Sequence, residues 1–200
     1  MMSARVQRSF EVLSCAYFES EFFANHYEFD VTFTIETDSI EEQNIALERI
    51  KFYLEFCLQN SVFVHDMDSE AIEKLTGAGL KVCTLPEEPY DQIIGIMLLH
   101  KMNAMTEGRI VATDIAITSH MSDGVTCFYE IEDNNGPFAL RGWWYDVAPT
   151  INGIKPKNKK VVKLAKPVVD WEEFELEWES TPKKSISSEV VFASFDKTDK

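Results

Sequence analysis

The stretch "YEFDVTFTIET", residues 27–37, alternates apolar and polar side chains more regularly than any other part of the chain. Its apolar side chains recur at every second position: Tyr27, Phe29, Val31, Phe33 and Ile35. Successive side chains of a β-strand point to opposite faces, so this period of two predicts a strand with one buried face and one wet face. The fold is therefore expected to be built on a sheet that meets water on one side.

The flanking segments extend this strand into a hairpin. Residues 8–23, "RSFEVLSCAYFESEFF", are rich in aromatic and β-branched residues, which favour strands. A short connection, Ala24–Asn25–His26, joins the two strands and predicts an antiparallel pair. A second hairpin is expected from residues 109–118 and 125–133, which flank the turn-rich stretch "SHMSDG".

Helical signals separate the two hairpins. A capping-box pair, Ser39 and Glu42, and apolar residues at three- and four-residue steps predict a helix over 40–59. A short helix from Asp68 or Ser69, a short strand "LKVCTL" and a second long helix over 90–105 follow. The order β-β-α-α-β-β predicts the α+β class: an antiparallel sheet of two hairpins with two long helices on one face, followed by an extended C-terminal arm.

Charge divides the chain into two parts. The net charge is −15; residues 1–150 hold nine Lys or Arg against 25 Asp or Glu, and residues 151–200 hold ten against nine. We therefore expect an acidic α+β domain over 1–150, with its core at about 8–133, and a separate arm over 151–200. Because an acidic body repels phosphate groups, nucleic-acid binding is not expected.

The C-terminal arm begins with a lysine-rich linker and continues with an acidic, aromatic stretch. Six lysines lie between positions 155 and 166. The stretch "DWEEFELEWES" at 170–180 alternates like a strand, but the spacing of Trp171, Phe174 and Trp178 also suits a helix. A lysine arm beside an acidic body is expected to fold back on that body or on a neighbouring copy.

The stretch "RGWWYD", Arg141–Asp146, is the expected contact surface. Trp143 and Trp144 are adjacent, so on an extended segment they point in opposite directions and do not both enter one core from one side. Contact with the arm or another subunit and packing within the chain are equal alternatives. Tryptophan and arginine are enriched among interface anchors. The predicted interface residues are Arg141, Trp143, Trp144, Trp171, Phe174 and Trp178.

Cysteine spacing and hydropathy indicate the cellular compartment in which the protein is expected. The four cysteines lie far apart with no CxxC pair, which indicates reduced, buried thiols and excludes a zinc finger or a disulfide framework. The longest apolar run, "IIGIMLL", has seven residues, far fewer than a membrane span needs. The N-terminus lacks the apolar core of a secretory signal. A cytoplasmic protein without membrane contact is expected.

His26 lies in the polar gap before the alternating strand, and two interpretations of it are open. It is either a metal ligand at the mouth of a site or a hairpin residue that opens the strand. Zinc needs three protein ligands even at an open catalytic site, and the segment before His26 contains no other histidine. His65 is the second weak candidate for catalysis, since Asp66 and Asp68 follow it closely.

The order of elements, together with "ANHY" at 24–27, resembles the tunnelling-fold family of 6-pyruvoyl tetrahydropterin synthase and its 6-carboxy-tetrahydropterin synthase relatives. The family's zinc site uses one histidine late in the first strand and a His-Gly-His pair opening the second. Here His26 matches one of that pair, Ala24 takes the place of the other, and the first strand contains no histidine.

The other family motifs are also altered. The Leu-Asp-His motif falls on Phe63-Val64-His65. The Glu-Thr motif, whose glutamate anchors the pterin or purine ring, falls on Thr118-Ser119. Residues 89–92, Pro-Tyr-Asp-Gln, match the family's Pro-Thr-x-Glu-Asn motif only weakly. The resemblance implies a family fold without its chemistry, so neither a metal nor a cofactor is expected, and His26 is interpreted as a hairpin residue.

Three functions follow, in decreasing order of preference. The first is a non-enzymatic interaction or assembly protein that self-associates, with an arm that docks on itself or on a neighbour; such an acidic scaffold suits a virus- or phage-encoded protein. The second is an enzyme or binder of pterin- or purine-like molecules with a rebuilt site, for which the suspects are His26, His65, Glu28 and Asp30. The third is an acidic nucleic-acid mimic that inhibits another protein.

Overall fold

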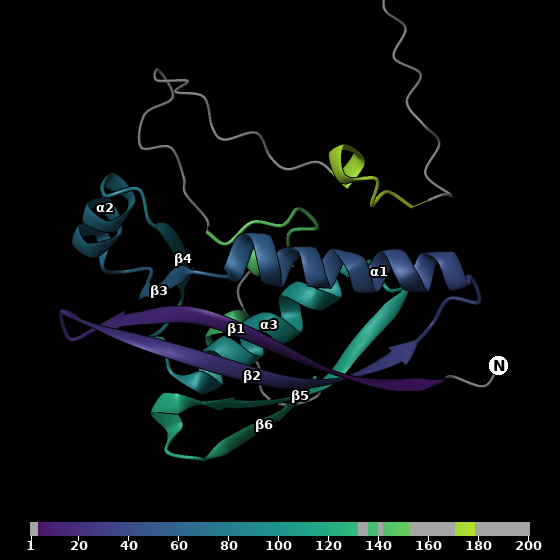
Figure 1. The fold of residues 1–200 in the computed structure, drawn as a ribbon, viewed down its shortest axis with the longest axis horizontal. Helices are drawn as coiled ribbons and strands as arrows, with labels where there is room; N and C mark the ends of the chain where they lie inside the picture. Colours follow the sequence, from purple (N-terminus) through teal and green to yellow (C-terminus); the bar gives the residue numbers. More distant parts are fainter. Residues whose placement is uncertain (1–3, 132–135, 140–141, 153–170, 179–200) are drawn as a thin grey trace, which may run out of the picture.

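The computed structural model describes residues 4–131, 136–139, 142–152 and 171–178, which form an α+β fold (Figure 1). The class agrees with the prediction. Six strands make one sheet, and three α-helices pack around it. In chain order the elements are β1 (Arg5–Phe18), β2 (Glu21–Ile35), α1 (Ile40–Phe52), β3 (Ser61–His65), α2 (Ser69–Gly77), β4 (Lys81–Leu85), α3 (Asp91–Thr106), β5 (Ile110–Ser119) and β6 (Thr126–Glu130).

The sheet is mixed, and the prediction of a purely antiparallel sheet is wrong. The strand order is β4-β3-β1-β2-β5-β6. The pairs β1–β2, β2–β5 and β5–β6 are antiparallel, as expected of two hairpins, but β3 runs parallel to both β1 and β4. No strand was predicted at β3. Its sequence, "SVFVH", is buried at four successive positions and shows no alternation of polar and apolar residues.

The first hairpin turns earlier than predicted. Glu19 and Ser20 form the connection, with φ of 53° and 65°. Two successive left-handed residues make a tight turn whose twist suits a hairpin, and Asn-Gly or Asp-Gly is the usual signal for it. Because Glu-Ser carries no such signal, the sequence placed the turn at Ala24–Asn25–His26. His26 therefore lies inside strand β2, opposite Leu13 of β1, and is not part of the hairpin turn.

The helices begin where their caps were predicted. Ser39 caps α1 by accepting a hydrogen bond from the backbone N–H of Glu42, and Asp68 caps α2 by accepting one from Ala71. After Phe52 the helix widens into a π-helical segment, Tyr53–Leu58, which accounts for the predicted length of 40–59. None of the described helices is both long and apolar enough to cross a membrane.

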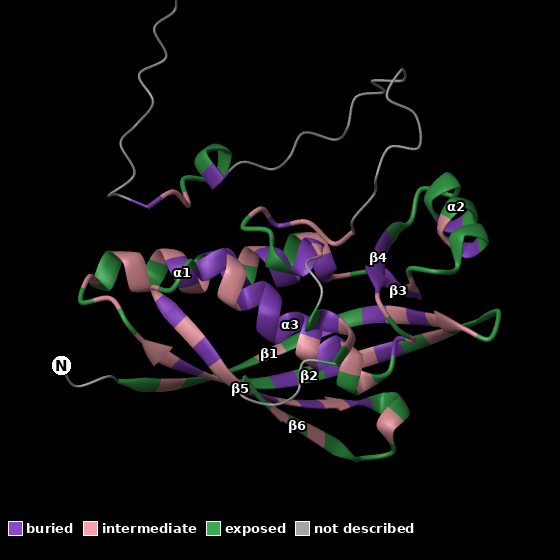
Figure 2. Ribbon diagram, turned by 180° about the vertical axis from the view of Figure 1, so that it is seen from behind, coloured by how far each residue is buried: buried purple, intermediate pink, exposed green. Residues whose placement is uncertain are grey.

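One face of the central strands is buried against α3, which is largely buried (Figure 2). Gly95 allows this helix to approach β5 closely, because a Cβ there would lie 3.2 Å from a methyl group of Ile117. Phe63 of β3 joins this main core, whereas its neighbours Val62 and Val64 pack with α2 in a smaller cluster. Since adjacent strand residues point to opposite faces, α2 covers the other side of the sheet at its β3–β4 end.

The segments after β6 form short turns of 3-10 helix. The predicted extended segment at Trp143–Trp144 is instead a turn, Trp143–Tyr145, and both indoles are buried. A turn at Trp171–Phe174 replaces the strand suggested by the alternation of 170–180. In a turn adjacent side chains are not forced to opposite sides, which is why both tryptophans enter the core of the same chain.

Candidate functional site

His26, the first predicted site residue, lies on the open face of β2. Its Nε2 is 3.4 Å from the carboxylate of Glu11, its Nδ1 is 3.9 Å from that of Glu28, and its ring centroid is 5.5 Å from the ring of His120. Glu11 and Glu28 lie directly opposite each other on the paired strands. His26 therefore belongs to an exposed, acidic strip of the sheet.

His65, at the end of β3, belongs to a different group. Its two ring nitrogens lie 3.8 Å from Asp66 and 3.6 Å from Glu88. Among the described residues it has no ion-pair partner in common with His26. Throughout the described residues, no three His, Cys, Asp or Glu side chains are grouped so as to hold a metal ion.

A buried polar cluster, which we define as Asn25, Tyr27, Asp91 and Ser119, is the most unusual site in the fold. Two of its members come from β2, one from the first turn of α3 and one from the end of β5. Asn25, Tyr27 and Ser119 are at most 5% exposed. One polar atom of each member lacks a partner of good hydrogen-bond geometry within the described part of the chain: Asn25 Nδ2, Tyr27 Oη, Asp91 Oδ2 and Ser119 Oγ. The Asn25 side chain nevertheless interacts with Tyr27, and that of Ser119 with Asp91.

The electrostatics of this cluster follow from its burial. Burial raises the pKa of Asp91, and the neighbouring Ser119 hydroxyl opposes this effect. Burial also raises the pKa of the Tyr27 phenol, with the nearby Asn25 side chain opposing it and Asp91 adding to it. Buried polar atoms are rarely left without partners, because each costs about 1–3 kcal/mol. The cluster could hold a small polar group that both donates and accepts hydrogen bonds.

Nucleophilic chemistry is not supported by the cysteines. Burial raises the pKa of Cys57 to about 11, and it raises the pKa of Cys83 and Cys127 as well. The thiolate is the reactive form of cysteine, so these three side chains are unreactive thiols at neutral pH. All four cysteines are free in the structure, as expected, but only Cys83 is buried; the other three are half-buried.

Lys101 joins α3 to the segment that follows β6. It is fully buried, and its ammonium group donates hydrogen bonds to the backbone carbonyls of Trp143 (3.1 Å), Asp146 (2.7 Å) and Ala148 (2.7 Å). The Nζ atom also lies 5.8 Å from the centre of the Tyr53 ring. Nothing in the sequence marked this lysine, which lies between His100 and Met102 in a largely apolar helix.

Lys101 gives a pH-dependent prediction. Burial lowers its pKa to about 8, below the ordinary value of 10.5, so between these two pH values the unfolded chain binds the extra proton. The free energy of unfolding of the wild type should therefore rise with pH relative to Lys101→Met, by about 1 kcal/mol between pH 7 and 9. Urea denaturation of both proteins at each pH measures this difference in the free energy of unfolding. A constant difference would show that Lys101 titrates normally.

Arg49 of α1 holds the C-terminal segment 171–178 on the body. It is 2% exposed. Its Nε donates to the carbonyl of Leu176 (2.8 Å), and its Nη1 donates to the carbonyl of Met105 (3.0 Å) and to the carboxylate of Glu107 (2.9 Å). One guanidinium group thus ties together three parts of the chain that are distant in sequence.

Aromatic rings complete this contact. The guanidinium carbon of Arg49 lies 4.8 Å from the centre of the Trp171 ring and 3.9 Å from that of Trp178. The guanidinium carbon of Arg109 lies 4.5 Å from the centre of the Trp178 ring. The ring centroids of Phe174 and Phe52 are 4.4 Å apart. Cations over indole faces are stabilised by the ring quadrupole, most strongly when water is excluded. We call Arg49, Arg109, Trp171 and Trp178 the arginine–tryptophan clamp.

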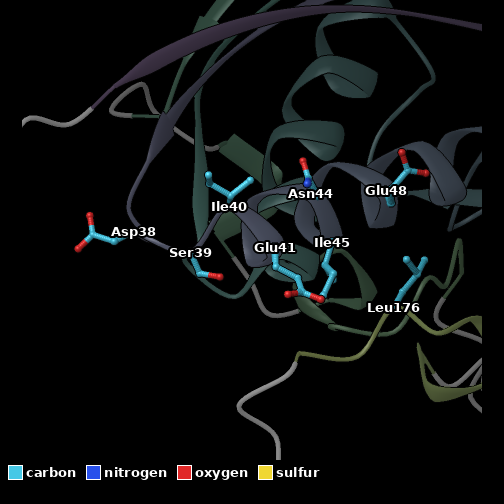
Figure 3. A pocket seen from close by; sticks show the side chains of 8 residues that line it. All are labelled: Asp38, Ser39, Ile40, Glu41, Asn44, Ile45, Glu48 and Leu176. Atoms are coloured by element: carbon cyan, nitrogen blue, oxygen red, sulfur yellow. The ribbon is translucent and has the colours of Figure 1, made fainter.

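A shallow groove continues from the clamp towards the N-terminal end of α1 (Figure 3). Leu176 of the docked segment lines one side of it, and Ile45 and Glu48 of α1 line the other. Asp38 and Glu41 add two more carboxylates at the far end. The groove is open and acidic, and its shape does not define a ligand.

The predicted interface residues divide into three groups. Trp143 and Trp144 pack in the main core beside α3, and Trp171 and Trp178 belong to the same core through the clamp. Phe174 packs on Phe52 but stays 42% exposed. Arg141 lies outside the described residues, as do the lysine-rich linker and residues 179–200. Where described, the arm docks on its own chain.

Comparison with known proteins adds no relative. No protein-family model matches the chain, and no curated protein sequence matches it. The likeness to the tunnelling-fold family therefore stays a prediction from the element order.

Proposed function

We propose that this protein is a non-enzymatic interaction or assembly protein that associates with copies of itself. The observation that carries the proposal is a sheet with two edges that no other described segment covers. Among the described strands, β6 pairs only with β5, and β1 meets β3 over three residues, Cys15–Tyr17, of its 14. An exposed strand edge offers unpaired N–H and C=O groups that favour pairing with another chain.

The chemistry of the described residues supports the same proposal. The weak catalytic candidates His26 and His65 lie in separate exposed groups, and no activated thiol is found among the cysteines with a resolved pKa shift. Exposed apolar side chains lie next to the free β6 edge, where Phe128 is 75% and Val125 is 59% exposed. Large exposed apolar side chains at a strand edge are typical of interaction surfaces.

Light scattering across a hundredfold range of protein concentration tests self-association. We expect a mass above that of the 22.9 kDa chain, with the oligomer dissociating on dilution. Metal content on the same sample is the control for the alternative of a metal enzyme. A chain mass at every concentration would refute self-association.

A second candidate function rests on the buried polar cluster. We propose as the alternative that the cluster binds a pterin- or purine-like molecule, whose ring edge carries both donors and acceptors. Four polar atoms that lack a partner of good hydrogen-bond geometry in the described residues converge there from three elements. In the tunnelling-fold resemblance the ring-anchoring glutamate falls on Thr118, and Ser119 of the cluster follows it directly.

Asp91→Asn and Ser119→Ala test this alternative. We expect saturable binding of guanine or pterin to the wild type by calorimetry, and loss of that binding in both variants. Because burial raises the pKa of Asp91, its stabilising contribution is present in acid and is lost as pH rises through the folded-state pKa. Asp91→Asn should therefore be at least as stable as the wild type at pH 7. Absence of saturable binding to the wild type would exclude the alternative.

A further inference from the structure

The first half of β1 presents an unpaired edge. Beyond the contact with β3, Gln59 and Asn60 hydrogen-bond to the N–H and C=O of Leu13. Because strand residues direct their backbone groups alternately to either side, the odd positions before Leu13 also direct theirs outward, where no other described strand lies. These positions are Arg5, Gln7, Ser9 and Glu11, and all four are exposed.

Helix α1 forms the second wall beside this edge. A groove of about 610 Å³ lies between the edge of β1 and α1. Phe10, Leu47 and Leu54 supply its apolar lining. Charges of both signs line it as well: Arg8, Lys51, Glu11, Glu48 and Glu55. A groove bounded by a free strand and a helix is the kind of surface that accepts an additional strand.

We infer that the occupant of this groove is the same edge of a second copy, so that β1 pairs antiparallel with β1 across a twofold axis. The inference rests on the self-association proposed above and names its surface. Such a contact is isologous, so each pair of residues occurs twice. Placing Arg5 opposite Glu11 and Gln7 opposite Ser9 uses all four outward positions and keeps the two faces of the sheet continuous.

Charge and hydrogen bonding select this register. The Arg5–Glu11 pair joins opposite charges on the open face, and it forms twice. A shift of two residues in one direction would require the backbone of Leu13, which Gln59 and Asn60 already occupy. The opposite shift places Glu11 beyond the described start of β1. In the selected register Arg8 faces its own counterpart on the axis, where Glu48 of α1 and Glu55 of the π-helical segment line the same groove and offset the two like charges.

Gln7→Pro tests the edge. The substitution removes an outward N–H and leaves the bonds between β1 and β2 in place, because those come from the even positions. By symmetry two hydrogen bonds are lost, so the dimer dissociation constant measured by light scattering should rise at least about tenfold. Phe128→Pro is the matched control, since its N–H points outward from β6, the other free edge.

Arg8→Cys tests the register. Cα atoms in a directly opposed, non-hydrogen-bonded pair lie about 4.5 Å apart, within the range that a disulfide spans. Under mild oxidation Arg8→Cys should therefore form a covalent dimer on non-reducing gels. Arg5→Cys should not cross-link to itself, because its own counterpart lies six residues away along the strand, about 20 Å. A mixture of Arg5→Cys and Glu11→Cys should cross-link, and the wild type controls for the native cysteines.

The outcomes separate this inference from the proposed function. A wild-type dimer that Gln7→Pro weakens and Arg8→Cys traps supports both. A dimer that resists Gln7→Pro but dissociates with Phe128→Pro, or an Arg8→Cys protein that does not cross-link, overturns the β1 interface and leaves self-association standing. A wild type that is monomeric at every concentration overturns both.

Discussion

Lys101→Met should lower the free energy of unfolding by about 3 kcal/mol, because three carbonyls, of which that of Trp143 is buried and two are part-buried, lose the ammonium group that satisfies them. The relief of burying a charge offsets part of this loss. For a domain of this size the melting temperature should fall by about 6–12 °C in thermal denaturation followed by circular dichroism. Limited proteolysis should cleave the variant within residues 142–152, which Lys101 holds against α3.

Lys74→Met is the matched control for this prediction. Lys74 lies exposed on α2, so its loss should change the free energy of unfolding by less than about 0.5 kcal/mol. If Lys101→Met were as stable as the control, packing of the methionine would fully compensate the three lost hydrogen bonds. The ammonium group would then contribute specificity of structure and no net stability.

Arg49→Met should release the C-terminal segment. The guanidinium makes three hydrogen bonds and lies against two indoles, and the variant leaves the carbonyls of Leu176 and Met105 without that donor. Breaking a buried charged contact by removing one partner costs about 3–5 kcal/mol. Tryptophan fluorescence should shift to the red as Trp171 and Trp178 meet water, and the melting temperature should fall.

Arg109→Met provides a graded comparison within the same clamp. Arg109 lies against Trp178 and forms a 3.7 Å ion pair with Glu42, but its side chain is 26% exposed. Loss of the Arg109 side chain should lower the free energy of unfolding by about 1 kcal/mol or less and should leave Trp171 buried. If both variants kept the wild-type fluorescence maximum, aromatic packing alone would hold the segment, and the role assigned to Arg49 would be wrong.

Docking of segment 171–178 also connects the fold to the proposed assembly. The clamp lies at the C-terminal half of α1, and the groove beside β1 is lined by residues of the same helix, including Leu47 and Lys51. A shift of α1 on release of the segment would change both sites. Arg49→Met is therefore a useful second variant in the light-scattering experiment, although the β1 register itself is tested by Arg8→Cys.

Local patterns in the sequence determined the class of the fold. Alternation over 27–37 gave the central strand, and the side chains of Ser39 and Asp68 set the starts of two helices. These signals depend on neighbours two to four positions away, which the sequence displays directly. The hairpin turn at Glu19–Ser20 was misplaced because its left-handed conformation is not encoded by the usual glycine or asparagine.

The candidate sites were decided by the tertiary structure alone. Asn25, Asp91 and Ser119 come together from two strands and a helix, and Arg49 bonds to a carbonyl 127 positions away. Parallel pairing of β3 likewise depends on a crossover connection whose partner no local pattern names. By itself the sequence therefore determined which segments become strands and helices, because that choice is local. Burial of Lys101, Arg49 and the polar cluster follows from contacts between distant segments, and these exist only once the chain has folded.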